Sequence, residues 1–127
     1  LNIVFCIGEN SKEKNNNKTF SVLKNQLTKV LEKSFNKNNI IVAYEPIWSI
    51  GTGKIPNSND LLKTTIYIKK VLKSIFKKNS PAVLYGGSVD GSNVNMFKQI
   101  KEIDGFLIGG ASKSSKKFID IIKNYYR

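Results

Sequence analysis

The sequence contains no histidine, and this absence removes several common kinds of active site. Without an imidazole, the chain alone can assemble neither a Ser–His or Cys–His nucleophile nor a histidine-based metal site. Cys6 is the only cysteine, so an internal disulfide and a zinc site made of thiolates are also excluded. We therefore predict no metal site within these residues.

Long apolar stretches are missing as well. No apolar run approaches the ~20 residues that a membrane span needs, and no signal-peptide pattern stands at the beginning. We expect a cytoplasmic protein that has no membrane partner. The chain lacks an initiator methionine and its first residues already read as a strand, so we also expect a piece of a longer protein.

Acidic residues are scarce. Asp and Glu total 9 against 21 Lys and Arg, which gives a formal net charge of +12. Such an excess would suit a nucleic-acid partner. However, the basic residues are spread over 12–37, 63–78 and 98–123, at the polar positions of helix-like patterns, as on a solvated outer face. No recognition motif accompanies them, and we rank nucleic-acid binding last.

What the chain does contain is an alternation of short apolar runs and amphipathic segments. With 127 residues, 40% of them hydrophobic, it suits one unit over residues 1–127. The runs that predict strands are Asn2–Gly8, Ile40–Tyr44, Ala82–Tyr85 and Asp104–Ile108. Apolar residues at helical spacing follow each run, over Val22–Phe35, Leu61–Phe76, Val94–Ile100 and Phe118–Ile122. This order predicts an α/β fold, a parallel sheet with helices on its outside.

The element boundaries are predicted from capping and breaking residues. We predict a polar loop over Ser11–Lys18 and, after it, a first helix that is capped by Asn17 or Thr19 and broken at Asn36–Asn39. A second helix is predicted to begin at Pro56–Ser58 and to stop near Asn79. The third predicted helix is capped by Asp90 or Ser92.

The stretch Ile40–Pro56 carries the strongest chemical signal. Its strand delivers one carboxylate, Glu45, and Pro46 keeps that residue on extended backbone. Large apolar residues and Gly51-Thr52-Gly53 follow, which is typical of a loop that closes over a pocket. We predict that Glu45 carries out proton chemistry in a dry pocket; the alternative is an ordinary surface acid at a strand end.

Three other reactive or charged side chains have separate interpretations. Glu9 follows the first strand, where it is either a second acid or a hydrogen-bonding support for a nearby group such as the Trp48 indole. Cys6 is expected in the core and not as a nucleophile, because nothing near it in sequence would lower its pKa. Lys54 is expected to be exposed.

Glycine pairs follow the second, third and fourth predicted strands, at Gly51–Gly53, Gly86–Ser88 and Gly109–Gly110. In a parallel sheet these loops lie at one edge, where their free N–H groups can hold a phosphate. Taken singly, each pair could equally mark a tight turn. None fits a nucleotide-binding motif, because Pro56 and Trp48 occupy positions that such motifs give to glycine. A small phosphorylated molecule is therefore the predicted ligand.

At this point the chain resembles a known family. AYEPIWSIGTGK (Ala43–Lys54), YGGSV (Tyr85–Val89) and DGFLIGGAS (Asp104–Ser112) are similar to the signature segments of triosephosphate isomerase. CIGE (Cys6–Glu9) and the segment Lys18–Leu27 resemble its fifth strand and fifth helix. The resemblance covers the whole chain and implies the C-terminal half, strands five to eight, of a TIM (β/α)8 barrel.

The resemblance also implies an activity, the cofactor-free interconversion of dihydroxyacetone phosphate and glyceraldehyde 3-phosphate through an enediolate. Its implied partners are a phosphorylated triose, the missing N-terminal barrel half and, for the complete enzyme, a second copy. The implied site comprises Glu45 as the catalytic base, Gly51, Ser88, Gly109 and Gly110 as phosphate-binding residues, Pro46, Ile47, Trp48, Ile50, Thr52, Gly53 and Lys54 as the lid, and Glu9, Tyr85 and Leu107 as supporting residues.

The chain departs from the family in three respects. The family's electrophilic histidine and its active-site lysine and asparagine belong to the absent half. Ser49 stands where alanine is usual. At the far end of the lid, Pro56 has no N–H to bond the hydroxyl of Tyr85, as the family's closed lid does. The rival interpretation is a non-catalytic half-barrel module that binds phosphate.

Overall fold

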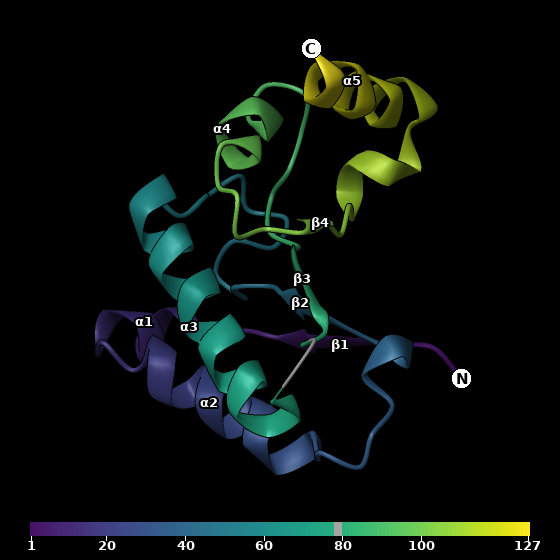
Figure 1. Ribbon diagram of the computed structural model, residues 1–127. Helices are drawn as coiled ribbons and strands as arrows, with labels where there is room; N and C mark the ends of the chain where they lie inside the picture. Colours follow the sequence, from purple (N-terminus) through teal and green to yellow (C-terminus); the bar gives the residue numbers. More distant parts are fainter. Residues whose placement is uncertain (78–79) are drawn as a thin grey trace.

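The computed structural model describes residues 1–77 and 80–127. These residues form a four-stranded parallel sheet in which the spatial order, β1-β2-β3-β4, is the chain order (Figure 1). The strands are β1 (Ile3–Ile7), β2 (Ile40–Tyr44), β3 (Ala82–Tyr85) and β4 (Gly105–Phe106). The predicted α/β class with parallel strand–helix units is confirmed.

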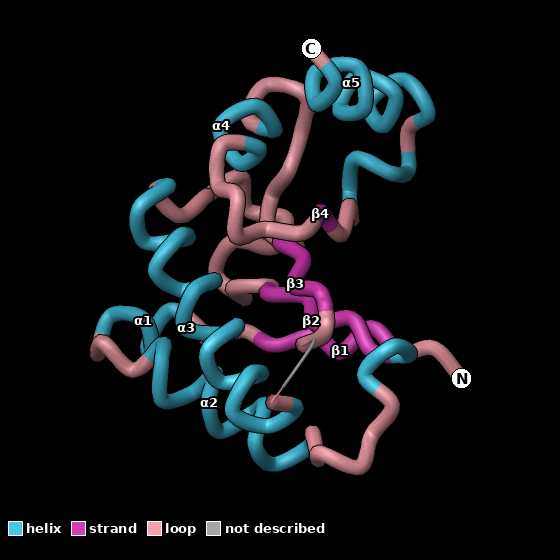
Figure 2. Tube along the Cα trace, viewed as in Figure 1, coloured by secondary structure: helices cyan, strands magenta, loops and turns pink. Residues whose placement is uncertain are grey.

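Helices connect the strands and pack on one side of them. They are α1 (Ser11–Asn15), α2 (Thr19–Val30), α3 (Ser58–Phe76), α4 (Val94–Lys98) and α5 (Ser115–Tyr126), with short 3-10 turns η1 (Lys37–Asn39) and η2 (Gly110–Lys113). Figure 2 shows α1, α2 and α3 gathered beside β1 and β2, with α4 and α5 together at the other end of the sheet. Each strand–helix unit is thus added next to the previous one.

The core lies between the sheet and these helices. Side chains alternate along a strand, so Val42 and Tyr44 of β2 point toward the same face. Both are buried there, and α2 contributes the fully buried Leu23 and Leu27. Phe20 of α2 stacks on Tyr67 of α3 with ring centroids 4.4 Å apart, which joins the two helices above the core.

The other face of the sheet is apolar but largely uncovered. The pairing of Val4 with Ile41 puts both on this inner face, and they are 47% and 38% exposed. Cys6 lies on the same face and is exposed, so the expectation that it belongs to the core is wrong. Successive side chains of β1 point to opposite faces of the sheet, and the packing of the helices decides which of those faces is covered.

The sheet is also open at both ends. Among the described residues, β1 pairs only with β2, and β4 pairs only with β3. Unpaired strand edges and an uncovered apolar face are both sites of association with other chains. The uncovered inner face and the free edges fit the half-barrel that the family resemblance implies.

The polar loop predicted at Ser11–Lys18 is wrong for its first part, where α1 forms. The Asn10 side chain accepts a hydrogen bond from the Glu13 N–H, and the Glu13 carboxylate accepts one from the Asn10 N–H. This reciprocal capping box satisfies two free N–H groups at once. The local bonds therefore outweigh the high content of asparagine that suggested a loop.

The limits predicted for the next helix also need correction. Neither Asn17 nor Thr19 caps α2: Thr19 is its first residue, and Lys18 precedes it with no side-chain capping bond. The helix ends at Val30, because Leu31 adopts an extended backbone conformation (φ −90°, ψ 133°). Leu31 is 5% exposed, so leaving the helix still brings this apolar side chain into the core.

The predicted boundaries of the later elements agree with the structure only in part. Asn57 caps α3 by accepting a hydrogen bond from the Asp60 N–H, as the predicted helix start requires. That helix ends at Phe76, and the predicted stop near Asn79 lies outside the described residues. Asn93, not Asp90 or Ser92, precedes α4. The fourth strand, predicted over 104–108, is only two residues long.

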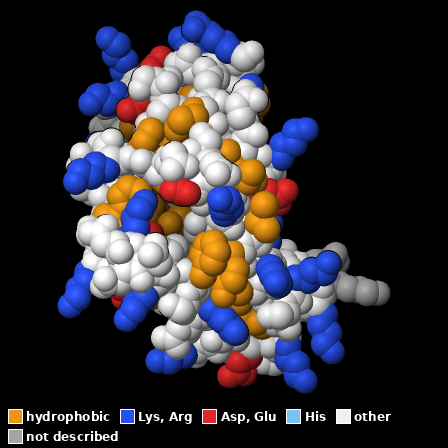
Figure 3. All heavy atoms as spheres, turned by 90° about the vertical axis from the view of Figure 1, so that its left-hand side faces the viewer, with side chains coloured by type: hydrophobic (Ala, Val, Ile, Leu, Met, Phe, Trp, Pro, Cys, Tyr) orange, Lys and Arg blue, Asp and Glu red, His pale blue; other side chains and the backbone are white. Residues whose placement is uncertain are grey.

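Basic side chains do not gather into one patch on the face shown in Figure 3, where lysines and arginines are spread around apolar and polar surface. This distribution matches the solvated helix faces expected from the sequence. Within residues 1–77 and 80–127, no helix is long and apolar enough to cross a membrane.

The fold predicts a sharp difference between two truncations on α2. Leu27→Ala removes a side chain that is 0% exposed, and we expect a loss of about 2–5 kcal/mol of unfolding free energy. Val30→Ala, on the same helix but 48% exposed, should change it by about 0.5 kcal/mol or less. Denaturant unfolding of both variants checks this, and equal effects would contradict the assignment of the core face.

Candidate active site

Glu45 is held in place by an extension of the strand pairing. It follows β2 directly, and its N–H donates to the Ile7 carbonyl at 2.7 Å. One residue further along the next strand, the Gly86 N–H donates to the Tyr44 carbonyl at 2.9 Å. The ladder therefore continues past the end of each strand and fixes the backbone of Glu45 between Gly8 and Gly86.

Both of these neighbours have to be glycine. A Cβ atom added to Gly86 would lie 2.6 Å from Cγ and 2.9 Å from Oε1 of Glu45. A Cβ atom on Gly8 would overlap the Glu45 carbonyl group. Since only glycine allows such close approach, Gly86 provides the room for the Glu45 side chain and Gly8 the room for its backbone carbonyl.

The same face of the sheet brings Cys6 beside Glu45. Partial burial, a hydrogen bond to the Glu45 carboxylate and its negative charge together raise the pKa of the Cys6 thiol to about 11. The thiol is therefore protonated at neutral pH and is a poor nucleophile. The high pKa of the thiol agrees with the prediction that Cys6 is no nucleophile; burial contributes most to it, and Glu45 adds to it.

A cavity of about 560 Å³ brings the predicted site together. Seven residues of the site implied by the sequence line it, namely Glu45, Ile50, Gly51, Gly53, Ser88, Gly109 and Gly110. They come from the segments that follow β2, β3 and β4. The glycine loops thus converge with the carboxylate at one edge of the sheet, as the parallel topology predicted.

The lid segment between Pro46 and Pro56 needs its glycines for backbone reasons. Gly51 and Gly53 have φ values of 66° and 74°, a region that residues with side chains rarely adopt. Both are exposed, as is Lys54, in agreement with its predicted position. Within the segment, the Thr52 hydroxyl donates to the Trp48 carbonyl at 3.0 Å and accepts from the Lys54 N–H at 3.1 Å.

Sequence reasoning missed two charged residues of this cavity. Lys117 and Asp120 of α5 also line it, and their spacing of three places them on one side of the helix. The charge of Lys117 contributes to lowering the pKa of Asp90, although the hydrogen bond from the Ser92 hydroxyl contributes more. Only the helical spacing of Lys117 and Asp120 could have indicated them, and it says nothing of what the helix faces.

Glu9 lies on the opposite face of the sheet from Glu45. It is 1% exposed, and the Tyr44 hydroxyl lies 3.1 and 3.2 Å from its two carboxylate oxygens. The Trp48 indole N–H donates to the same carboxylate at 2.9 Å. The structure contains the hydrogen bond to the Trp48 indole that the supporting interpretation requires, and it places Glu9 away from the cavity of Glu45.

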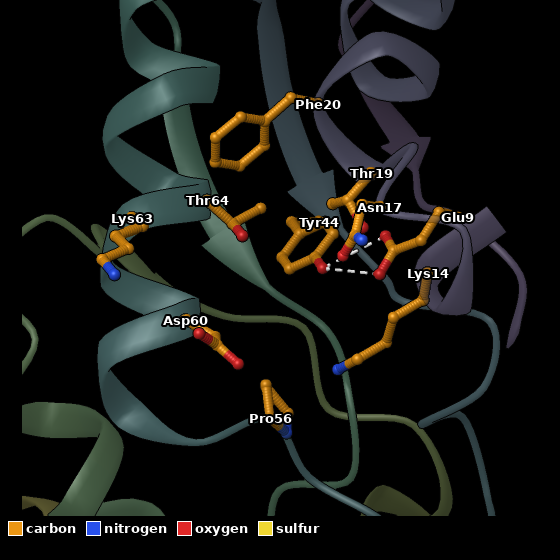
Figure 4. Close-up of a pocket in the computed structure, with 10 residues that line it drawn as sticks. All are labelled: Glu9, Lys14, Asn17, Thr19, Phe20, Tyr44, Pro56, Asp60, Lys63 and Thr64. Carbon is orange, nitrogen blue, oxygen red and sulfur yellow. Dashed lines mark hydrogen bonds between the residues drawn. The ribbon is translucent and has the colours of Figure 1, made fainter.

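Figure 4 shows the surroundings of this second carboxylate, a separate cavity of about 320 Å³ between α1, α2 and α3. Burial and the nearby charge of Glu9 raise the pKa of Tyr44. Lys14 reaches across from α1 and places its ammonium 3.6 Å from the centre of the Trp48 ring. A lid residue is thus held on the outer face by a hydrogen bond at its edge and a cation over its ring.

Tyr85 and Leu107, predicted as supporting residues, lie at the ends of β3 and β4. The Leu107 N–H donates to the Tyr85 carbonyl at 3.0 Å, so Leu107 follows β4 on the inner face, where it is half-buried. Tyr85 is 1% exposed, and its ring packs on Phe97 with centroids 4.7 Å apart. Burial raises the pKa of the Tyr85 hydroxyl.

Among the residues that the structure describes, no group of three His, Cys, Asp or Glu side chains could hold a metal ion. The site offers the Glu45 carboxylate beside a neutral thiol, under a lid, next to backbone N–H groups, one lysine and the side chains of Asp90 and Asp120.

Comparisons of the sequence with known proteins all match the chain to one family. A family model described as triosephosphate isomerase matches residues 1–125. The curated triosephosphate isomerase of Saccharomyces cerevisiae is 41% identical over 127 residues, which cover 98% of this chain and 51% of that protein. That of Thermodesulfovibrio yellowstonii is 37% identical over 125 residues, or 97% of this chain and 51% of that protein.

A solved structure agrees with them. The crystal structure of triosephosphate isomerase from Bartonella henselae matches with a TM-score of 0.87 and 33% sequence identity, over 100% of this chain and 51% of that one. The likeness confirms the predicted half of a (β/α)8 barrel. The chain spans about half the length of the curated relatives it matches.

The contact between Cys6 and Glu45 predicts an unusual pH profile of alkylation. With a pKa of about 11, the rate of Cys6 modification by iodoacetamide should rise about tenfold per pH unit between roughly pH 8 and pH 10. Glu45→Gln removes the negative charge that raises the pKa, so it should speed alkylation at about pH 8. Mass spectrometry of the Cys6 peptide measures both rates. Glu13→Gln serves as a control, and a plateau below about pH 9 would contradict the prediction.

Proposed function

The chain belongs to the triosephosphate isomerase family, and on that basis we propose that it supplies the C-terminal half of an enzyme that interconverts dihydroxyacetone phosphate and glyceraldehyde 3-phosphate. In this proposal Glu45 takes a proton from one carbon of the bound triose and returns it to the neighbouring carbon. The intermediate is an enediolate, as in the known scheme of the family, and no cofactor takes part.

The observation that carries the proposal is the position of Glu45 in a cavity with four residues proposed to bind phosphate. Backbone N–H groups of Gly51, Ser88 and Gly110, with Gly109 beside them, would hold the dianion. Lys117 lines the same cavity and adds a positive charge. The carboxylate and the phosphate would then be fixed relative to each other, which orients the carbon chain for proton transfer.

The lid has a defined task in this proposal. Ile50 and Gly51 line the cavity from the lid side, so a closed lid would place apolar surface and a backbone N–H over the substrate. Excluding water strengthens the interactions of the carboxylate and protects the enediolate from side reactions. Leu107 would form part of the pocket wall from β4.

The reaction also needs groups that this chain lacks. With no histidine in the sequence, the described cavity has no neutral imidazole to polarise the substrate carbonyl. The uncovered inner face and the two free sheet edges match the surface that a second half-barrel would cover. We therefore propose that residues outside these 127 provide the remaining catalytic groups.

The proposed partners are thus a phosphorylated triose and the N-terminal half of the barrel. A homodimer of the complete enzyme and a cytoplasmic location follow from the family resemblance alone. A second candidate, a half-barrel that only binds phosphate, is favoured by one observation. All four proposed phosphate-binding residues lie in one cavity within this chain.

The assignment of the base predicts a large loss in one variant. Glu45→Gln in the complete protein should lower turnover by about 10²- to 10⁴-fold, because the amide cannot accept the substrate proton. Coupled isomerase assays measure this, with Glu32→Gln, at an exposed position, as the matched control. Turnover near that of the parent protein in the Glu45 variant would refute the assignment.

The 127-residue chain alone should show no isomerase activity above background, because the carbonyl is left without a polarising group.

Calorimetry with a phosphorylated enediolate mimic, together with sedimentation, separates the two candidates. If the chain binds the mimic and associates with itself, the half-barrel module is supported. If the chain is a monomer that does not bind the mimic, the half-barrel module is ruled out. Robust turnover by the chain alone would contradict the proposed need for a second half.

A further inference from the structure

Ser49 is the point at which the lid is joined to the rest of the protein. Its side chain is 0% exposed, whereas its lid neighbours Ile47 and Ile50 are 56% and 48% exposed. The Ser49 hydroxyl donates to the Lys54 carbonyl at 2.6 Å, which closes the lid segment on itself. This bond uses the only hydrogen that the hydroxyl can donate.

Two further groups reach the same oxygen from the loop that follows β3. The Ser88 N–H donates to Ser49 Oγ at 3.4 Å, and the Tyr85 hydroxyl lies 3.4 Å away from it. A serine oxygen accepts two hydrogen bonds, and its hydrogen is already placed on Lys54. Tyr85 is therefore the donor in this contact, and the hydroxyl of Ser49 is fully used.

The loop after β3 is shaped around this contact. A Cβ atom on Gly87 would overlap the Tyr85 hydroxyl and lie 2.8 Å from Ser49 Oγ, so only glycine leaves room for the pair. The Ser88 hydroxyl adds a bond from the loop to the lid by donating to the Ser49 carbonyl at 2.6 Å. Lid and loop are thus joined through both the main chain and the side chain of Ser49.

Pro56, at the other end of the lid, offers no N–H to the Tyr85 hydroxyl. The buried Tyr85 hydroxyl instead uses Ser49 as its hydrogen-bond partner. The two positions at which the lid departs from its family are therefore linked by one side chain. The serine provides the contact with Tyr85 that the proline cannot.

We propose that Ser49 is a positioning residue that holds the lid on the loop after β3 until a substrate phosphate displaces it from the Ser88 N–H. The inference rests on the proposed function, which assigns that N–H to the phosphate. The single hydrogen of an N–H group makes one good hydrogen bond, and a phosphate oxygen is a stronger acceptor than a hydroxyl oxygen. Binding therefore exchanges the long bond to Ser49 for a charge-assisted bond and frees the Ser49 side chain from the loop as the lid closes over the substrate.

The test uses the complete protein with inorganic phosphate as the probe, measured by calorimetry and as a competitive inhibitor. In Ser49→Ala no hydroxyl has to be displaced, so phosphate should bind about three- to tenfold more tightly. KM for the triose phosphate should fall by a similar factor while kcat does not rise. Unchanged or weaker phosphate binding would overturn the proposal.

Thr28→Ala is the matched control, because it also removes a hydroxyl but lies outside the lid and the cavity. The Thr28 side chain is exposed and donates to the Lys24 carbonyl within α2 at 2.9 Å. We expect its phosphate affinity to stay within about twofold of the parent value. An equal shift in both variants would mean a general effect of removing a hydroxyl and would count against a specific role of Ser49.

Tyr85→Phe keeps the test decisive if Ser49→Ala does not fold. It retains the ring that packs on Phe97 and removes only the hydroxyl that donates to Ser49. A smaller shift toward tighter phosphate binding is expected, and no shift would refute the proposal. A parent protein that is active and binds phosphate, with no response in either variant, rejects this inference alone. A parent that does not bind phosphate rejects the proposed function as well.

Discussion

The parallel register between β1, β2 and β3 is the constraint on which the site depends. It continues beyond the strands through the bonds from the Glu45 N–H to Ile7 and from the Gly86 N–H to Tyr44. Glu45 is thereby fixed between two glycines, of which Gly86 leaves space for its side chain and Gly8 for its backbone carbonyl. A shift of one residue in the register would turn Glu45 to the helix-covered face and bring an apolar side chain into the cavity.

The same alternation separates two acids that look alike in the sequence. Glu45 faces the inner side with Cys6, while Glu9 is buried on the outer side with Tyr44 and the Trp48 indole. The lid is therefore in contact with both faces of the sheet edge. Trp48 is held on the outer face, and Ser49 is held on the loop that is proposed to bind phosphate.

The fold is incomplete in the same places as the chemistry. The inner face that carries Glu45 also exposes Val4 and Ile41, and the sheet ends at unpaired edges on both sides. A second half-barrel would cover that apolar surface and pair those edges. In the proposed enzyme, it would also bring the group that polarises the carbonyl. One interface would then complete the core and the active site together.

The sequence by itself determined the order of strands and helices, because apolar runs and helical spacing are local patterns. It also determined that Glu45 and the glycine loops lie at the same edge of the sheet, because parallel strands bring their carboxyl ends to one edge whatever the detailed packing. Local capping was misread at α1, where Asn10 and Glu13 satisfy each other. Only the tertiary structure decided that Cys6 faces Glu45, that Lys117 lines the cavity and that Ser49 bonds Tyr85. Each of these contacts joins residues far apart in the chain, and the packing of helices on one face of the sheet sets which side chains meet.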